Sequence, residues 1–324
     1  MRRRDLLGLT AAAIAAPITA ARAQNPARTY RVAYLGPSPR SAPPQHGFIE
    51  ALAKSGYVEG RNLSIDDRGF ACKPEQFAEV ARQIVDDAPD AIVCGGPGPG
   101  RAAREATRTI PLLVNTDDMV GEGFVASMAR PEGNVTGVSV RSPDLDGKRF
   151  ELLLELIPNA RRVDALAGGD TANPEHFEAL RELARKRGVE LGTHIAGSYG
   201  DIAPAIDAAK AAGAVGLNVL GSALLFGNRQ VIYGKTAALA LPAIYQWPEN
   251  AREGGLIGYG PSITRIYEEQ LSRLAVKIFR GAKPADLPVE HPDQFDLAVN
   301  LNAAQVLHLT VPPLLLAQAH DVVE

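Results

Sequence analysis

The feature that most constrains the fold of this chain is an alternation that begins at Tyr30. Short apolar runs, each closed by a turn rich in glycine or aspartate, alternate with amphipathic stretches. The stretch 75–88, for example, places Phe77, Ala81 and Ile84 on one helical face. This alternation predicts βαβ units, in which helices cover a parallel sheet, and therefore an α/β fold class.

The predicted strands form two groups, which indicates two lobes. They cover residues 30–35, 62–66, 90–94, 111–116 and 135–140 in the first group, and 161–167, 189–195, 214–220 and 242–247 in the second. We expect two doubly wound parallel-sheet lobes joined by a hinge, with the helix 262–281 returning to the first lobe. The expected crossovers are 141–144, 248–250 and 283–292. Lobe I then comprises 29–141 plus 250–284, and lobe II comprises 142–249 plus 285–324.

Residues 1–23 have the composition of an export signal. A basic start precedes an apolar stretch from Leu6 to Ile18, and Ala21-Arg22-Ala23 predicts cleavage. Arg3 and Arg4 fit the twin-arginine pattern, so both Tat and Sec stay open as routes. An uncleaved anchor helix is the alternative, disfavoured because a span needs roughly 20 apolar residues. No cysteine follows the cleavage site for a lipid anchor. We therefore expect a soluble, monomeric protein in the periplasm.

Net charge and cysteine content argue against nucleic-acid-binding, membrane-binding and disulfide-rich classes of protein. Residues 1–23 carry four arginines and one aspartate, so their removal changes the net charge from −3 to −6. A surface of that sign is a poor partner for nucleic acid or an anionic membrane. With only Cys72 and Cys94, the fold cannot depend on a disulfide framework. A 2-1-3 strand order separates them by about 10 Å, beyond the roughly 7 Å limit for a disulfide, so we expect free thiols.

Motifs for catalysis or cofactors are weak in this sequence. The six histidines share no ligand spacing, and neither a G-x-S-x-G elbow nor a phosphate loop is present. Residues 94–103 contain a G-x-G-x-x-A match, with Asp117 at fingerprint spacing, but prolines remove N–H groups that a pyrophosphate needs. The other interpretations of this loop are a helix N-terminus facing a ligand carboxylate and a tight solvent turn. We therefore expect no metal, no cofactor and no enzymatic activity.

Candidate ligand residues follow the predicted strands, because ligands of open parallel sheets bind at the carboxyl ends of the strands. Two such lobes facing one another form a cleft. The candidates are Gly36, Ser38, Gly96, Gly98, Gly100, Thr116 and Asp118 in the first lobe, and Asp170, Ser222, Tyr245, Gln246 and Trp247 in the second.

These candidates are expected to bind different parts of the ligand. The backbone N–H groups of Gly98 and Gly100 would bind an anionic end, and the Asp118 carboxylate would bind a cationic end. Asp118 has the alternative of capping a helix near Gly121. Trp247 has the alternative of a core aromatic residue.

Several blocks resemble one family of ABC-transporter substrate-binding proteins, which includes tryptophan- and tyrosine-type binders. The blocks are IPLLVNTDDMVGEGFVASMARPEGNVTG at 110–137, GYVEGRN at 56–62, LPAIY at 241–245, GYGP at 258–261, GAKPADLPVE at 281–290 and NLNAA at 300–304. The family commonly has threonine-proline after the third strand and aspartate-proline after the fourth. This chain has Pro97-Gly98 and Asp118-Met119 there.

The resemblance implies a type I periplasmic-binding fold, with two lobes, three crossovers and a hinge that closes on a ligand. It further implies a solute receptor of an ABC importer, with a small-molecule ligand, amino acids as the leading class, and an inner-membrane ABC permease as partner. Two alternatives stay open. One is a ligand-sensing module for a receptor kinase or chemoreceptor, and the other is a nucleotide-using α/β enzyme.

Overall fold

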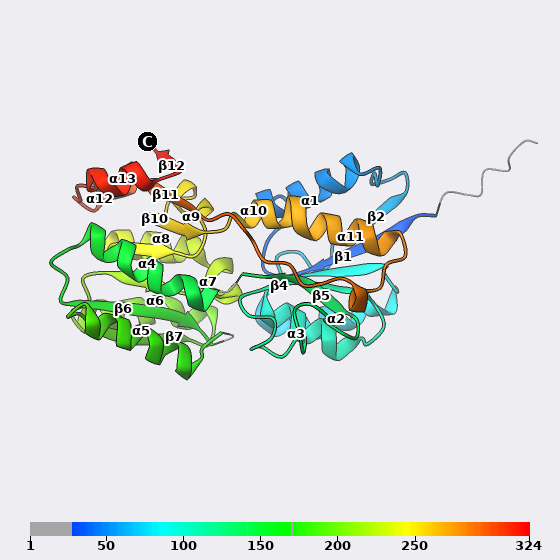
Figure 1. Cartoon of the computed structure of the whole chain (residues 1–324), viewed down its shortest axis with the longest axis horizontal. Helices are drawn as coiled ribbons and strands as arrows, with labels where there is room; N and C mark the ends of the chain where they lie inside the picture. The colour runs from blue at the N-terminus through cyan, green and yellow to red at the C-terminus, as the bar shows by residue number, and fades with distance from the viewer. Residues whose placement is uncertain (1–27, 141, 170) are drawn as a thin grey trace, which may run out of the picture.

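The computed structural model describes residues 28–140, 142–169 and 171–324. The predicted export signal 1–23, Arg141 at the expected first crossover, and the candidate Asp170 lie outside the described residues. Two α/β lobes lie side by side in Figure 1, which confirms the expected fold class.

Lobe I is built on a parallel sheet in the order β2-β1-β3-β4-β5. Its strands are β1 (Tyr30–Leu35), β2 (Leu63–Asp66), β3 (Ala91–Gly95), β4 (Leu112–Thr116) and β5 (Val135–Ser139). Its first three helices are α1 (Pro43–Lys54), α2 (Phe77–Asp86) and α3 (Pro97–Ala106). Along β1, Val32 and Tyr34 belong to one core cluster, and Ala33 and Leu35 to another. The central strands β1, β3 and β4 are largely apolar on both faces because helices cover both sides of the sheet.

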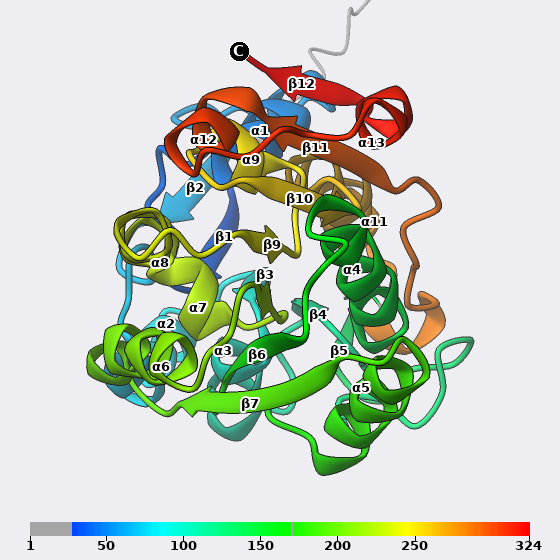
Figure 2. The same cartoon turned by 90° about the vertical axis from the view of Figure 1, so that its left-hand side faces the viewer.

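Lobe II contains a seven-stranded sheet in the order β12-β11-β10-β9-β8-β6-β7, which faces the viewer in Figure 2. Its strands are β6 (Arg162–Gly168), β7 (Glu190–Ala196), β8 (Leu217–Val219), β9 (Ala243–Tyr245), β10 (Ile257–Gly260), β11 (Asp296–Asn300) and β12 (Asp321–Val323). Its helices are α4 (Ser142–Leu156), α5 (Pro174–Lys186), α6 (Tyr199–Ala211), α7 (Ala223–Gly227), α8 (Arg229–Ala238), α9 (Glu249–Arg252), α12 (Leu301–Val306) and α13 (Pro313–Gln318). The sheet is parallel except where β11 runs antiparallel to β10.

The sheet topology moves two of the expected lobe boundaries. Strand β10 pairs with β9 and β11, so 250–260 belongs to lobe II and not to lobe I. Glu290 forms a bridge with Val138 of β5, and Leu287 is buried in a lobe I core, so 285–290 belongs to lobe I. The chain therefore changes lobes after β5, after β10 and again between Glu290 and β11.

The segment between β10 and the last crossover returns to lobe I, as the helical pattern at 262–281 predicts. It consists of α10 (Ile263–Arg265), a π-helical turn η2 (Ile266–Leu271) and α11 (Ser272–Phe279). Its apolar residues join the core cluster that β1 and α1 also form. A π-helical turn shifts the side chains that follow it, and such turns are frequent at functional sites.

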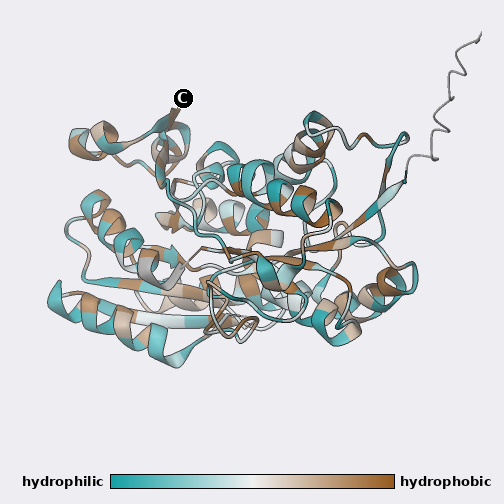
Figure 3. Ribbon diagram, turned by 45° about the vertical axis from the view of Figure 1, so that its right-hand side comes forward, coloured by the Kyte–Doolittle hydropathy of each residue, from teal (hydrophilic) through white to brown (hydrophobic). Residues whose placement is uncertain are grey.

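Hydropathy follows this architecture. In Figure 3 the inner strands are largely brown, while the outer helices carry both brown and teal residues. No helix within the described ranges has the length and apolar character needed to cross a membrane.

Cys72 and Cys94 are both buried, and both thiols are free, as the predicted strand order indicates.

Candidate functional site

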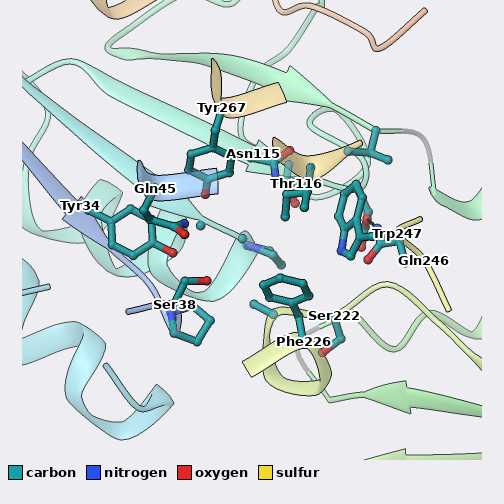
Figure 4. A pocket seen from close by; sticks show the side chains of 18 residues that line it. Tyr34, Ser38, Gln45, Asn115, Thr116, Ser222, Phe226, Gln246, Trp247 and Tyr267 are labelled. Carbon is teal, nitrogen blue, oxygen red and sulfur yellow. Dashed lines mark hydrogen bonds between the residues drawn. The ribbon is translucent and has the colours of Figure 1, made fainter. Parts of the chain in front are cut away.

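A pocket lies between the two lobes, where the strands of both sheets end (Figure 4). Its lobe I wall contains Tyr34, Ser38, Gln45, Asn115, Thr116, Asp117 and Tyr267. Its lobe II wall contains Ser222, Ala223, Phe226, Gln246 and Trp247. In Figure 4 the rings of Tyr34 and Tyr267 lie across the pocket from those of Phe226 and Trp247. The pocket thus combines apolar rings with a few polar groups, as small-molecule sites commonly do.

Two buried phenols hold the lobe I wall together. Tyr34 interacts with Ser38 and with the hydroxyl of Tyr267, and burial raises the pKa of Tyr34 to about 12, so its phenol is neutral. Gly36 and Gly95 make room for this ring, because a Cβ at either position would lie 2.4 Å from the Tyr34 hydroxyl oxygen. The η2 turn supplies Tyr267, whose hydroxyl also interacts with the Gln45 side chain.

Two amide oxygens of this wall have no hydrogen-bond partner. They are Gln45 Oε1 on α1 and Asn115 Oδ1 at the end of β4. Gln45 is 3% exposed and Asn115 is 6% exposed, so bulk water reaches neither side chain freely. A buried acceptor without a partner costs about 1–3 kcal/mol.

A carboxyl group lies directly behind Thr116. The Thr116 hydroxyl donates to Glu122 Oε1 at 2.6 Å, and the Asp118 backbone N–H donates to the same oxygen at 3.1 Å. Burial, assisted by the negative charge of Asp117, raises the pKa of Glu122 to about 7. Near neutral pH, Glu122 therefore exists partly in its protonated form.

The two lobes contact each other at the pocket. Gln246 Nε2 of lobe II donates to Asp117 Oδ1 of lobe I at 2.7 Å. A Cβ placed on Gly96 of lobe I would lie only 2.6 Å from Cβ of Ala223 in lobe II. Gly96 has φ of 120°, a conformation that favours glycine. The described conformation is therefore a closed cleft.

The lobe II wall is held by its own local contacts. Ser222 is the N-cap of α7, and its Oγ accepts a hydrogen bond from the Leu225 backbone N–H at 3.2 Å. The Trp247 backbone N–H donates to Asn250 Oδ1 at 2.9 Å. The Trp247 side chain is 5% exposed and belongs to the core cluster of lobe I, although its backbone follows β9 of lobe II. Trp247 thus links the two lobes.

Comparisons with known proteins decide the family. Residues 39–323 match the model of the family described as ABC transporter substrate binding protein. The chain belongs to this family. The resemblance seen in the sequence blocks is thereby confirmed, including its fold.

Individual relatives agree with this assignment. A curated tyrosine-binding protein of Clostridioides difficile (strain R20291) is 25% identical over 267 residues, which are 81% of this chain and 76% of that protein. A crystal structure of a conserved domain protein from Vibrio cholerae superposes with a TM-score of 0.81 at 26% identity, covering 91% of this chain and 99% of that one. A structure from Streptococcus pneumonia in complex with L-Trp also has a TM-score of 0.81, at 23% identity and the same coverage.

The structure brings six of the sequence-predicted residues together at the pocket of this family member. They are Ser38, Gly96, Thr116, Ser222, Gln246 and Trp247. Gly36 does not line the pocket but leaves space for the Tyr34 ring, as described above. Asp170 lies outside the described residues.

Four other predicted residues do not line this pocket. Gly98 and Gly100 lie in the first turn of α3, against Phe77 and Phe124, and the Gly100 N–H donates to the Gly96 carbonyl. Neither glycine lines the pocket, and the Gly100 N–H is already bonded within the helix, so the predicted anion contact is not supported there.

Asp118 and Tyr245 are the other two predicted residues that do not line the pocket. Asp118 Oδ1 accepts from the backbone N–H groups of Val120 at 3.1 Å and Gly121 at 2.9 Å. These residues form a turn and not a helix, so the helix-capping alternative is wrong as well. Asp118 lines a neighbouring cavity instead. Tyr245 lies 3% exposed within lobe II, where its ring packs edge-on against Tyr233.

Sequence reasoning missed several lining residues. Tyr34 lies within a predicted strand, Gln45 on a helix, and Tyr267 on a helical face that the periodicity assigned to the core. Asn115 and Asp117 stand beside the predicted Thr116 and Asp118, so the strand-end signal indicates positions within one residue of these lining residues. Among the described residues, no group of three or more His, Cys, Asp and Glu side chains could hold a metal ion.

Proposed function

We propose that this protein is the exported solute-binding component of an ABC importer, and that it encloses a small amphipathic solute between its lobes. The observation that carries the proposal is the pocket itself, whose aromatic and polar groups come from both lobes. Amino acids are the leading class of solute, because the relatives named above are a tyrosine-binding protein and a complex with L-Trp.

Binding alone accounts for the work of such a receptor. A ligand that touches both walls stabilises the closed form only by the contacts it loses when the lobes separate. Changing a closed-to-open ratio from 1:99 to 99:1 requires about 5.5 kcal/mol of such differential contact. The Gln246–Asp117 hydrogen bond and the Gly96–Ala223 contact join the two lobes, so both form when the lobes close on the ligand. The closed form is the one that a permease partner would recognise.

The experiment is a thermal-shift screen of the mature protein against metabolites, followed by calorimetry on each binder. A ligand at 100 times its Kd stabilises the native state by about 2.7 kcal/mol, which a melting curve resolves. We expect a binder among the amino acids. A binder found only among sugars, nucleotides or metal ions would refute the amino-acid class.

Export and partnership have separate tests. Intact-mass analysis of a periplasmic extract should find a chain that begins after residue 23, and replacement of Arg3 and Arg4 by lysine should block export if the route is Tat. Genes for a permease and an ATPase should lie beside this one. A neighbouring receptor-kinase or chemoreceptor gene in their place would favour the sensing function.

A further inference from the structure

The two unpartnered amide oxygens lie on one wall of the pocket. Asn115 pairs in register with Gly95, so both residues face the same side of the lobe I sheet. A Cβ on Gly95 would lie 2.4 Å from the Tyr34 hydroxyl and 3.2 Å from that of Tyr267, which places both phenols beside this face. Gln45 adjoins Tyr267 from α1. In Figure 4 Gln45 and Asn115 flank Tyr267.

The Gln45 side chain adjoins the Tyr267 hydroxyl, and its Oε1 is buried without a hydrogen-bond partner. An amide oxygen accepts hydrogen bonds and cannot donate them. Oε1 is therefore an atom that can accept from a further partner.

The chemistry of the missing partner is that of a donor. Both free atoms are acceptors, and both side chains are more than nine-tenths buried. Asp117 is the one formally charged side chain among the described lining residues, and its charge is negative. The faces of aromatic rings that surround the pocket also attract cations. A primary ammonium group supplies three N–H donors and a positive charge together.

We infer that Gln45 and Asn115 are specificity-determining residues, which accept hydrogen bonds from an ammonium group of the solute. This inference rests on the proposed function, since it concerns the solute of the same pocket. Solutes of the same carbon skeleton without the nitrogen leave both oxygens unpaired in the closed cleft, and a site built to hydrogen-bond a group rejects analogues that lack it.

The test compares matched solutes on the mature protein. L-Tryptophan, L-tyrosine and L-leucine are titrated beside indole-3-propionate, 3-(4-hydroxyphenyl)propionate and 4-methylpentanoate, which lack only the amine. We expect binding only among the three amino acids, which carry the ammonium group. Asn115→Leu and Gln45→Met should each weaken it about 10- to 100-fold, the range for a hydrogen bond to a charged group. Equal binding of a deaminated acid, or unchanged affinity in both variants, would overturn the inference.

Asn218→Leu is the matched control. Asn218 Oδ1 is also buried without a partner, but this side chain lies outside the pocket, and its Nδ2 donates to the Asp146 carbonyl at 3.2 Å. This variant should lose stability and keep the solute preference.

Ligand-free melting curves separate this inference from the proposed function. Asn115 Oδ1 has no partner within the protein, so Asn115→Leu breaks no bond of this oxygen and should not lower the ligand-free melting temperature. A clear loss of stability would mean that Asn115 bonds within the protein, which contradicts the inference. If no solute of either set binds, the amino-acid proposal fails, and the melting curves alone decide the inference.

Discussion

Replacing Glu122 by glutamine should change how the stability of this protein depends on pH. The Glu122 side chain is 16% exposed, and its Oε2 is buried without a hydrogen-bond partner. Burial and the charge of Asp117 raise its pKa from 4.5 to about 7, against the opposing effects of Thr116, the Asp118 N–H and Arg101. Glutamine keeps the accepting oxygen and never ionises, so it resembles the protonated acid.

The sign follows from proton binding. Between pH 4.5 and 7 the folded protein holds a proton on Glu122 that the unfolded chain has lost, so the free energy of unfolding falls as the pH rises. Each pKa unit corresponds to 1.36 kcal/mol, so the full shift amounts to about 3 kcal/mol at pH 8. Glu122→Gln should therefore match the unmodified protein near pH 4.5 and exceed its stability by up to about 3 kcal/mol at pH 8.

Urea unfolding of both proteins at pH 5, 6, 7 and 8 measures this difference, because the other titrating groups cancel between them. Glu79→Gln serves as the control, since Glu79 is exposed and its interaction with Arg82 lowers its pKa. This control should gain no stability at pH 8. Parallel pH profiles for Glu122→Gln and the unmodified protein would refute the assignment of a raised pKa to Glu122.

Three further predictions concern the core and the cleft. Arg149→Met should cost about 3–5 kcal/mol in urea unfolding, because Arg149 and Asp146 form a fully buried ion pair and the carboxylate would keep only His176, whose Nε2 lies 2.9 Å from Asp146 Oδ2. The double variant with Asp146→Leu should recover part of the loss, since it removes the buried carboxylate. Ala223→Leu should weaken ligand binding in calorimetry without lowering the ligand-free melting temperature, because the larger side chain meets Gly96 only when the lobes close. Trp247 is the one tryptophan, so its emission should change with ligand along the calorimetric isotherm, and unaltered emission would place it away from the ligand.

The sequence predicts most of the fold because most strands are apolar on both faces. All five strands of lobe I and four of lobe II coincide with predicted runs to within three residues at each end. The three strands that were missed carry weak signals. Half of β10 is glycine, β12 has three residues, and β11 follows a proline-rich segment. Their pairing in the sheet, and not local propensity, makes them strands.

The site was predictable where it lies at strand ends. Thr116 and Gln246 directly end or follow parallel strands, and the topology fixes which edge they occupy. Gln45 and Tyr267 reach the pocket only because α1 and η2 pack on lobe I, which no local pattern encodes. Asp118 was predicted at the pocket but does not line it, because its carboxylate accepts hydrogen bonds from the turn that follows.

Because each lobe is assembled from separate stretches of chain, the order of synthesis matters. About 140 residues separate the end of β5 from the end of α11, and at 5–20 residues per second their synthesis takes about 7 to 30 s. During that time the lobe I sheet lacks the α10–α11 cover of one apolar face. A nascent chain of this length should therefore depend on chaperones, which bind exposed apolar surface. An isolated lobe I would need a rearranged gene that joins residues 28–140 directly to 262–290.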